Sequence, residues 1–382
     1  MKNILFLSHD ANRAGAQILL LRFLRLLKGN QDFQFSILLK DGGIIENEFK
    51  EIAQTYLWQV PKSGRGESFL AKLYRKFTSN DNDQSNLIEI LKKQKFDLIV
   101  SNTITNGDIL PVLSQLNIPI MSYVHELEMG IQQYTKPEYF QNVKSLSTAF
   151  IACAASVKEN LIINHQIDTT LIRVLPSLLP ESALNYQANK KVNESLRNHY
   201  NIPLDAFIIG GMGTVDFRKG VDVFLQVAHK LKTDSSIFFL WVGGQETETE
   251  FKNFQIDKSR LGLENVVFQP SVNNPLDFMS IFDVFFVSSR EDPYPLVVLE
   301  AAMLSKPIIC FEKAGGAKDF VELDCGIIVE YLNVDDAVKN IIKLKENRII
   351  GEQMGICGRK KVLKRHNQTI AYQTFVDILH EK

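Results

Sequence analysis

The sequence predicts an α/β protein made of two doubly wound, parallel-sheet domains that face each other across a cleft. Its 382 residues are more than one hydrophobic core normally serves, so two domains are expected. Short apolar runs rich in β-forming residues alternate with helical stretches, and this alternation appears in two series. Such a rhythm is typical of parallel strands covered by helices on both faces.

The two series of expected strands are separated by a proline-rich break. The first series lies at 4–8, 35–39, 97–102, 119–126 and 148–154. The second lies at 207–213, 237–244, 265–270, 284–289, 306–312 and 325–331. Leu175-Pro176 and Leu179-Pro180 interrupt the pattern between them, so we expect domains at 1–180 and 181–365, followed by a helix at 366–382.

The composition excludes several classes of protein. Lys and Arg number 43 against 44 Asp and Glu, a balance that argues against a general nucleic-acid binder. The four cysteines form no Cys-x-x-Cys pair, so neither a zinc site nor a disulfide framework is expected; they are Cys153, Cys310, Cys325 and Cys357. We find no signal peptide and no apolar run of the roughly 18 residues needed to span a bilayer, which favours a cytoplasmic protein.

The stretch SSREDPYPLVVLEAA (288–302) predicts a strand, a loop and then a helix that begins at Leu296 just after Pro295. The first N–H groups of a helix have no partner within the helix and carry partial positive charge, so those of Leu296 and Val297 suit a phosphate. Glu300 follows about one turn later, where its carboxylate can accept two hydrogen bonds from a vicinal diol such as that of ribose.

The acids at the start of this loop have the same chemistry. Asp292 or Glu291 can accept hydrogen bonds from the hydroxyls of a second sugar. The spacing of the two ends therefore matches a ligand with a sugar, a diphosphate and a ribose. The alternative is an ordinary strand, loop and helix with solvated acids.

A second glycine-rich loop, in GGMGTVDFRKGVDVFLQVA (210–228), comes between a strand and an amphipathic helix. Arg218 and Lys219 fall just before that helix, so we expect their charges at the cleft. As an alternative, both side chains belong to an ordinary solvated surface.

Polar residues also end two strands of the first domain. His125 and Glu126 follow one of them, and Asn102 and Thr103 end the strand before it, where they are candidates for the acceptor side of a site. A lone histidine in such a place is more often structural, so His125 gains weight only from the other motifs. Gly15 lies in the loop after the first strand, which lacks the full G-x-G-x-x-G pattern of a dinucleotide site.

The run from Asp292 to Glu300 resembles the acid-x7-acid signature of the retaining nucleotide-sugar glycosyltransferases of family four, which have the GT-B fold. The resemblance implies that the first acid contacts the donor sugar and that Glu300 holds the ribose. This chain has Asp292 where the family usually has Glu, and Glu291 stands beside it. Lys219-Gly220 matches a family Lys-Gly whose lysine binds the donor diphosphate.

Other positions follow from the same resemblance. The family commonly has Arg after the glycine that ends the preceding strand, where this chain has Thr214 after Gly213, and we expect Arg218 to supply that charge. His125 matches a histidine beside the donor sugar, and Gly243 ends a strand that packs close to the nucleotide. Gly15 is expected to let substrate approach the backbone, and the terminal helix to cross back onto the first domain.

The resemblance thus implies transfer of a sugar, with retention, from a nucleotide-diphosphate donor to a glycan or lipid-linked acceptor in cell-surface polysaccharide or glycoconjugate synthesis. No Asp-x-Asp ends a strand, so no obligatory metal or other cofactor is expected. Residues 68–77 (SFLAKLYRKF) interleave apolar and basic side chains, which suits peripheral contact with an anionic membrane as well as it suits a packed surface helix. Two alternatives stay open: another nucleotide-sugar enzyme on this fold, such as an epimerase or phosphorylase, or a binding protein without turnover.

Overall fold

The structure is a computed structural model, and it describes residues 1–58 and 81–381. Residues 68–77, which suit either membrane contact or a packed surface helix, lie outside the described residues. The chain divides into two compact units. Unit 1 contains 1–153, 157–175 and 372–382, and unit 2 contains 154–156 and 176–371.

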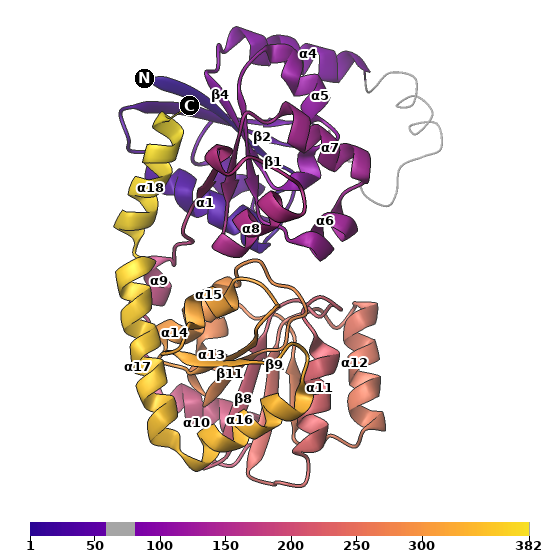
Figure 1. Cartoon of the computed structure of the whole chain (residues 1–382), viewed down its shortest axis with the longest axis vertical. Coiled ribbons are helices and arrows are strands. Elements are labelled where there is room, and N and C mark those ends of the chain that lie inside the picture. Colours follow the sequence, from indigo (N-terminus) through magenta and orange to yellow (C-terminus); the bar gives the residue numbers. More distant parts are fainter. Residues whose placement is uncertain (59–80, 382) are drawn as a thin grey trace. The chain divides into compact units, whose positions relative to one another are not determined.

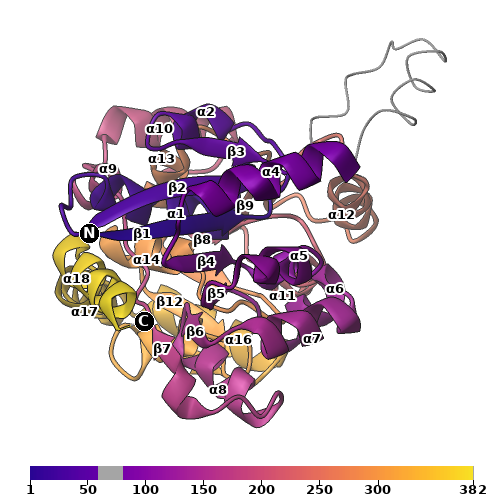
Figure 2. The same ribbon diagram turned by 90° about the horizontal axis from the view of Figure 1, so that it is seen from above.

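Unit 1 is built on a seven-stranded parallel sheet with the order β3-β2-β1-β4-β5-β6-β7, which can be followed from one edge to the other in Figure 2. Its strands are β1 (Lys2–Ser8), β2 (Phe33–Leu39), β3 (Thr55–Leu57), β4 (Leu98–Asn102), β5 (Ile120–Val124), β6 (Ala149–Ala152) and β7 (Ile172–Val174). The side chains of β4 and β5 are buried throughout, as expected for central strands covered on both faces.

The helices that precede residue 176 connect these strands. They are α1 (Gly15–Leu27), α2 (Glu46–Lys50), α4 (Asp81–Lys93), α5 (Leu110–Leu113), α6 (Glu128–Tyr134), α7 (Pro137–Leu146) and α8 (Ala155–Ile163), with 3-10 turns η1 (Ile104–Asn106), η2 (Ser114–Leu116) and η3 (Thr169–Leu171). The buried face of α1 carries Leu20, Phe23, Leu24 and Leu27, in agreement with its apolar period.

Unit 2 contains a six-stranded parallel sheet with the order β10-β9-β8-β11-β12-β13. Its strands are β8 (Phe207–Met212), β9 (Ile237–Val242), β10 (Val266–Gln269), β11 (Val284–Val287), β12 (Ile308–Phe311) and β13 (Gly326–Val329). Figure 1 shows β8, β9 and β11 among the helices of this unit.

The helices after residue 176 complete the chain. They are α9 (Glu181–Leu184), α10 (Lys190–His199), α11 (Val221–Lys230), α12 (Thr249–Arg260), α13 (Pro275–Ser280), α14 (Leu296–Met303), α15 (Ala317–Val321), α16 (Val334–Glu346), α17 (Arg348–Arg365) and α18 (Gln368–His380). From Tyr372 onward α18 belongs to unit 1, where the ring of Phe375 lies 4.8 Å from that of Phe23 and 6.1 Å from that of Phe6.

Both faces of the sheet in unit 2 are covered, because alternate residues of β8 enter different apolar clusters. Phe207 and Ile209 pack in one cluster, which includes Phe224 of α11. Ile208 packs in another, which includes Leu299 of α14. The prediction of two doubly wound parallel sheets is therefore confirmed.

Two strands of unit 1 were not predicted from the sequence. Strands β3 and β7 have three residues each, lie at the edges of the sheet in unit 1, and are only partly buried. An edge strand is covered less than a central one, so neither carries the continuous apolar run by which the others were recognised. Among the residues that the structure describes, none lies in a helix long and apolar enough to cross a membrane.

Candidate functional site

Both sheets reverse their strand order at one point, and the polar residues of interest gather at the carboxyl ends of the strands beside it. In unit 1 the reversal lies between β1 and β4, and in unit 2 it lies between β8 and β11. Ligands of open α/β sheets bind at such topological switch points, outside the carboxyl ends of the strands. We describe the two switch points in turn.

At the switch point of unit 2, two cations meet one buried carboxylate. The Lys219 ammonium donates to Oδ2 of Asp292, and Nη1 of Arg218 lies 3.8 Å from Oδ1 of the same carboxylate. Arg218 also donates to the carbonyl oxygen of Glu291, at 3.0 Å. Asp292 is only 6% exposed, so its charge requires these partners. The structure thus brings Arg218, Lys219 and Asp292 together.

A glycine brings the two loops into contact. Gly220 has φ of 65°, and a Cβ atom there would lie 2.1 Å from the carbonyl oxygen of Ser288 at the end of β11. Ser288 Oγ donates to the carbonyl of Lys219 at 3.1 Å, and the N–H of Arg290 donates to the carbonyl of Arg218 at 2.8 Å. Only glycine combines this backbone conformation with this close approach, so Gly220 fixes Lys219 beside β11.

Asp216 organises the turn that carries the two cations. Its Oδ1 accepts from the N–H of Lys219 at 2.7 Å, and its Oδ2 accepts from the hydroxyl of Thr214 at 2.9 Å. Arg218 Nη2 lies 4.0 Å from the same carboxylate. The hydroxyl of Thr214 is therefore directed at Asp216, and the guanidinium that reaches Asp292 comes from Arg218. Sequence reasoning missed Asp216.

The second loop ends on helix α14 as predicted. Pro295 is the residue before the helix, Leu296 and Val297 supply its first N–H groups, and the half-buried Glu300 follows one turn later. The neighbouring glycine turn supports this loop, since the N–H of Gly316 lies 3.0 Å from the carbonyl oxygen of Pro293. A Cβ at Gly316 would lie 2.3 Å from that same oxygen.

Two further predicted glycines pack against each other at the ends of neighbouring strands. Gly213 follows β8 and donates its N–H to Val242 at 3.0 Å, and Gly243 follows β9. A Cβ at Gly243 would lie 2.1 Å from the carbonyl oxygen of Gly213. Gly213 and Gly243 therefore allow the two loops to pack closely against each other.

At the switch point of unit 1, a single amide joins β4, β5 and the start of α1. Asn102 Oδ1 lies 2.8 Å from Nε2 of His125, and Asn102 Nδ2 donates to the carbonyl oxygen of Ala16 at 3.3 Å. Because the amide nitrogen faces a carbonyl, the amide oxygen faces the imidazole, which must then carry its proton on Nε2. Burial lowers the pKa of His125 to about 3, with a smaller contribution from nearby His9, so the ring is neutral near pH 7.

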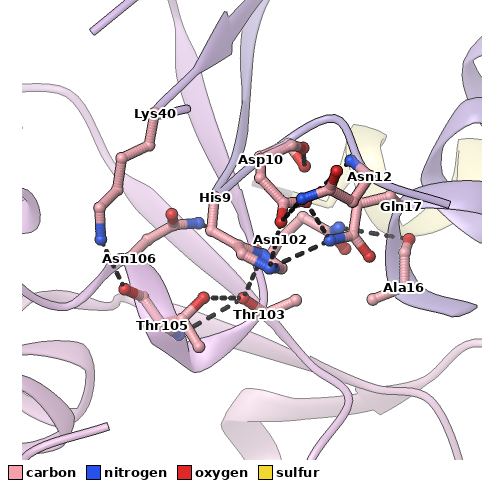
Figure 3. Close-up of polar contacts among 11 residues, drawn as sticks. His9, Asp10, Asn12, Ala16, Gln17, Lys40, Asn102, Thr103, Thr105 and Asn106 are labelled. Atoms are coloured by element: carbon pink, nitrogen blue, oxygen red, sulfur yellow. Dashed lines mark hydrogen bonds and ion pairs between the residues drawn. The ribbon is translucent and has the colours of Figure 1, made fainter. Parts of the chain in front are cut away.

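A second network surrounds His9, directly after β1 (Figure 3). His9 Nδ1 lies 3.2 Å from the hydroxyl of Thr103, and His9 Nε2 lies 3.0 Å from Nε2 of Gln17. Gln17 also donates to Asp10. Thr103 is buried and has φ of 74° and ψ of 158°, a backbone region that is costly for any residue except glycine. The network around its hydroxyl holds it there.

Lys40, after β2, extends this network on its other side. Its ammonium donates to Asp108 Oδ1 at 2.8 Å and to the carbonyl of Thr105 at 3.1 Å, and the hydroxyl of Thr105 lies 2.6 Å from that of Thr103 (Figure 3). Sequence reasoning missed His9, Asp10, Gln17 and Lys40. The run Ser-His-Asp directly after the first expected strand was the signal that could have found the first two.

Of the residues predicted in the first domain, the structure brings Asn102, Thr103 and His125 to one edge of the sheet. Glu126 is buried, and its Oε2 accepts from the backbone N–H of His125 at 2.9 Å. Gly15 is the first residue of α1, and no atom lies within 4 Å of a Cβ built there. Across residues 1–58 and 81–381, no group of three or more His, Cys, Asp or Glu side chains could hold a metal ion.

Solved structures of other proteins share this fold. The crystal structure of Anabaena HepE in complex with UDP and glucose superposes with a TM-score of 0.81 at 17% identity, over 99% of both chains. The sucrose-phosphate synthase of Thermosynechococcus elongatus superposes with a TM-score of 0.77 at 17% identity, over 100% of this chain and 99% of the other. The fold is therefore the GT-B fold.

The sequence comparisons give the family. Residues 192–361 match the family described as "Glycosyl transferases group 1". The chain is 25% identical to the O-antigen biosynthesis glycosyltransferase WclY of Escherichia coli over 70% of this chain and 74% of that protein. It is 24% identical to an uncharacterized glycosyltransferase of Methanocaldococcus jannaschii over 88% and 86% of the two chains. These matches confirm the predicted resemblance to the group 1 glycosyltransferases and support transferase activity.

Proposed function

We propose that this glycosyltransferase moves a sugar, with retention of configuration, from a nucleoside-diphosphate sugar to a glycan or lipid-linked acceptor in the synthesis of a cell-surface polysaccharide. The observation that carries the proposal is the pairing of Lys219 and Arg218 with Asp292, next to the N-terminus of α14. A diphosphate bound there would share both cations and accept from the N–H groups of Leu296 and Val297.

The roles of the individual residues follow from this placement. Lys219 and Arg218 would stabilise the negative charge that grows on the departing diphosphate. Glu300, one helical turn beyond Leu296, would accept from the ribose hydroxyls. Asp292 would orient Lys219 through the ion pair and contact the sugar with Glu291 beside it. No step requires a metal, because cations and helix N–H groups supply the positive field.

His125 would act as a neutral hydrogen-bonding group beside the transferred sugar. Its Nε2 proton is committed to Asn102, so the opposite ring nitrogen, Nδ1, is the acceptor in this tautomer. A carboxylate nucleophile is not part of the proposal. The departing phosphate would instead take the acceptor's proton on the face where it leaves, which retains the configuration.

The known roles by which two relatives are named support the polysaccharide assignment. Besides the O-antigen enzyme, the chain is 25% identical to the capsular polysaccharide biosynthesis glycosyltransferase CapM of Staphylococcus aureus, over 59% of this chain and 60% of that protein. UDP and glucose are the ligands named for HepE. UDP-glucose is therefore the first donor to test.

The decisive experiment combines a binding screen with product analysis. Nucleoside-diphosphate sugars are screened by thermal shift, and the product formed from the stabilising donor is identified by mass spectrometry and its anomeric configuration by NMR. We expect one class of donor to raise the melting temperature of the wild-type protein and not that of a Lys219→Ala variant. An inverted product, or equal stabilisation of both proteins, would contradict the proposal.

Contact with a membrane through residues 68–77 belongs to the same proposal, because a lipid-linked acceptor lies at a membrane. Neutralising Lys72, Arg75 and Lys76 should abolish sedimentation with vesicles that contain an anionic phospholipid. Vesicles of neutral lipid serve as the control. Equal sedimentation of the wild-type and neutralised proteins would remove this part of the proposal.

A further inference from the structure

One buried histidine of unit 2 lies outside the chemistry described so far. His366 occupies the break between α17 and α18 and is only 7% exposed. Its Nδ1 lies 2.9 Å from the carbonyl oxygen of Ser177, and its Nε2 lies 2.9 Å from the hydroxyl of Tyr294. The rings of Tyr294 and Phe320 lie at 5.7 and 5.9 Å from the imidazole.

These contacts fix the proton of the ring. A carbonyl oxygen can only accept, so Nδ1 of His366 carries the proton and donates to Ser177. In the neutral ring Nε2 can only accept, so it receives the O–H of Tyr294. Burial lowers the pKa of His366, which favours this neutral form. The hydrogen bonds therefore run in one direction, from Tyr294 to His366 to Ser177.

Tyr294 belongs to the loop that carries the donor-site carboxylate. It stands two residues after Asp292 and directly before Pro295, the residue that precedes α14. Its ring is held against the glycine turn, where a Cβ on Gly316 would lie 2.6 Å from Tyr294 Cδ2. Gly316 in turn donates to the carbonyl oxygens of Asp292 and Pro293, at 3.1 and 3.0 Å. A shift of the Tyr294 ring would therefore move the backbone that aims Asp292 at Lys219.

The other partner of His366 lies where the chain enters unit 2. The long stretch of this unit runs from Pro176 to Ala371, and Ser177 is its second residue. His366 itself lies five residues before the end of that stretch, where the chain returns to unit 1. One imidazole thus ties the entering and the returning segment of unit 2 to the loop of Asp292.

We propose that His366 is a positioning residue for the nucleotide-sugar site. Acting through Tyr294, it fixes the position of the Asp292 loop relative to the two segments that connect the units. The inference rests on the proposed donor site. Through His366, the affinity for the donor and the conformation of the connecting segments would depend on each other. A purely structural histidine would only stabilise the core.

The binding test is a double-mutant cycle on the Tyr294 to His366 hydrogen bond. Tyr294→Phe removes the hydroxyl and keeps the ring, and His366→Asn keeps a donor for Ser177 and removes the acceptor for Tyr294. We expect each single variant to raise the Kd for UDP about three- to tenfold, and the double variant to bind no more weakly than the weaker single variant. Tyr186→Phe, which loses a 2.6 Å hydrogen bond to Asp277 elsewhere in unit 2, is the matched control and should leave the Kd unchanged.

A second measurement needs no nucleotide. Amide hydrogen exchange of the free protein should quicken at 176–179 and at 363–371 in Tyr294→Phe and stay at the wild-type rate in Tyr186→Phe. Equal exchange in Tyr294→Phe and wild type would overturn the link, as would an unchanged Kd for UDP or strictly additive effects in the cycle. A wild-type protein that binds neither UDP nor GDP would overturn the donor site instead, so the two failures can be told apart.

Discussion

The two topological switch points occupy equivalent places in their sheets and carry different chemistry. In unit 2 the contact across the switch point is ionic, from Lys219 to Asp292. In unit 1 it consists of neutral groups, from His9 to Thr103 and from Asn102 to the carbonyl oxygen of Ala16. The same topology thus yields a charged edge in one unit and a largely neutral one in the other.

The two edges suit different parts of the substrates of a transferase. A diphosphate needs cations whose interaction strengthens as charge develops. Sugar hydroxyls need groups of fixed hydrogen-bonding direction, and a neutral imidazole held by an amide supplies that direction without attracting the diphosphate. Substitutions that remove the charge in unit 2 or add a charge in unit 1 test this contrast.

The largest effect is expected from removing a charge in unit 2. Lys219→Ala should lower kcat about 100- to 1000-fold, or about 2.7–4 kcal/mol, because a stabilising donor of the transition state is lost. Lys230→Ala is the matched control, since Lys230 ends the helix that follows Lys219 and forms a 2.8 Å ion pair with the exposed Asp335. Steady-state kinetics with the identified donor measure both. A Lys219→Ala enzyme within threefold of wild type, roughly the size of a surface ion pair, would refute the assignment.

Giving unit 1 a charge should have the next largest effect. In Asn102→Asp a carboxylate faces Nε2 of His125, which should raise the pKa of that imidazole from about 3 by about one to three units. Activity should then fall as the pH drops below about 6, where the imidazole would begin to protonate. Proton NMR of the His125 ring follows the titration directly. Asn102→Ala, which removes the amide and adds no charge, should show no such new ionisation.

A smaller effect is expected at the ribose end of the donor site. Glu300→Gln should weaken nucleotide binding about tenfold, because a charged acceptor becomes a neutral one. Glu291→Gln should weaken it less, since Glu291 lies at the other end of the loop. Isothermal titration with UDP compares the two variants. If Glu291→Gln had the larger effect, the order of sugar and ribose along the loop would be reversed.

A separate prediction concerns the stability of unit 1. Burial lowers the pKa of His9 and of His125, so each binds a proton more readily in the unfolded chain than in the folded one. Stability should be complete above about pH 6.5 and should fall as the pH is lowered toward 3, by at most about 1.4 kcal/mol per pH unit for each histidine.

The two tryptophans allow this to be measured unit by unit. Trp58 is buried in unit 1 and Trp241 in unit 2. Urea unfolding followed by the fluorescence of Trp58, in a Trp241→Phe background, reports on unit 1 alone. His125→Gln should flatten the acid dependence, and substitution of the exposed His199 should not. An unchanged dependence in His125→Gln would contradict the assigned cause.

Much of the donor site could be predicted from the sequence because its residues follow strands that are neighbours in a doubly wound sheet. Lys219 and Asp292 each lie shortly after such a strand, so a parallel sheet brings them to one edge. The network of His9 needed the strand order as well, which no single run of residues reveals. His366 and Tyr294 are 72 residues apart, and His366 follows no strand, so only the fold could join them.

Unit 1 combines segments that are far apart in the sequence, and this affects its assembly during synthesis. The Lys2 ammonium donates to the carbonyl oxygen of Leu379 at 2.8 Å, and Phe375 packs beside Phe6 and Phe23 in the core of unit 1. β1 is therefore synthesised long before the part of α18 that belongs to unit 1, and residues 176–371 of unit 2 are made between them. The core of unit 1 is complete only after this long stretch of unit 2 has been translated.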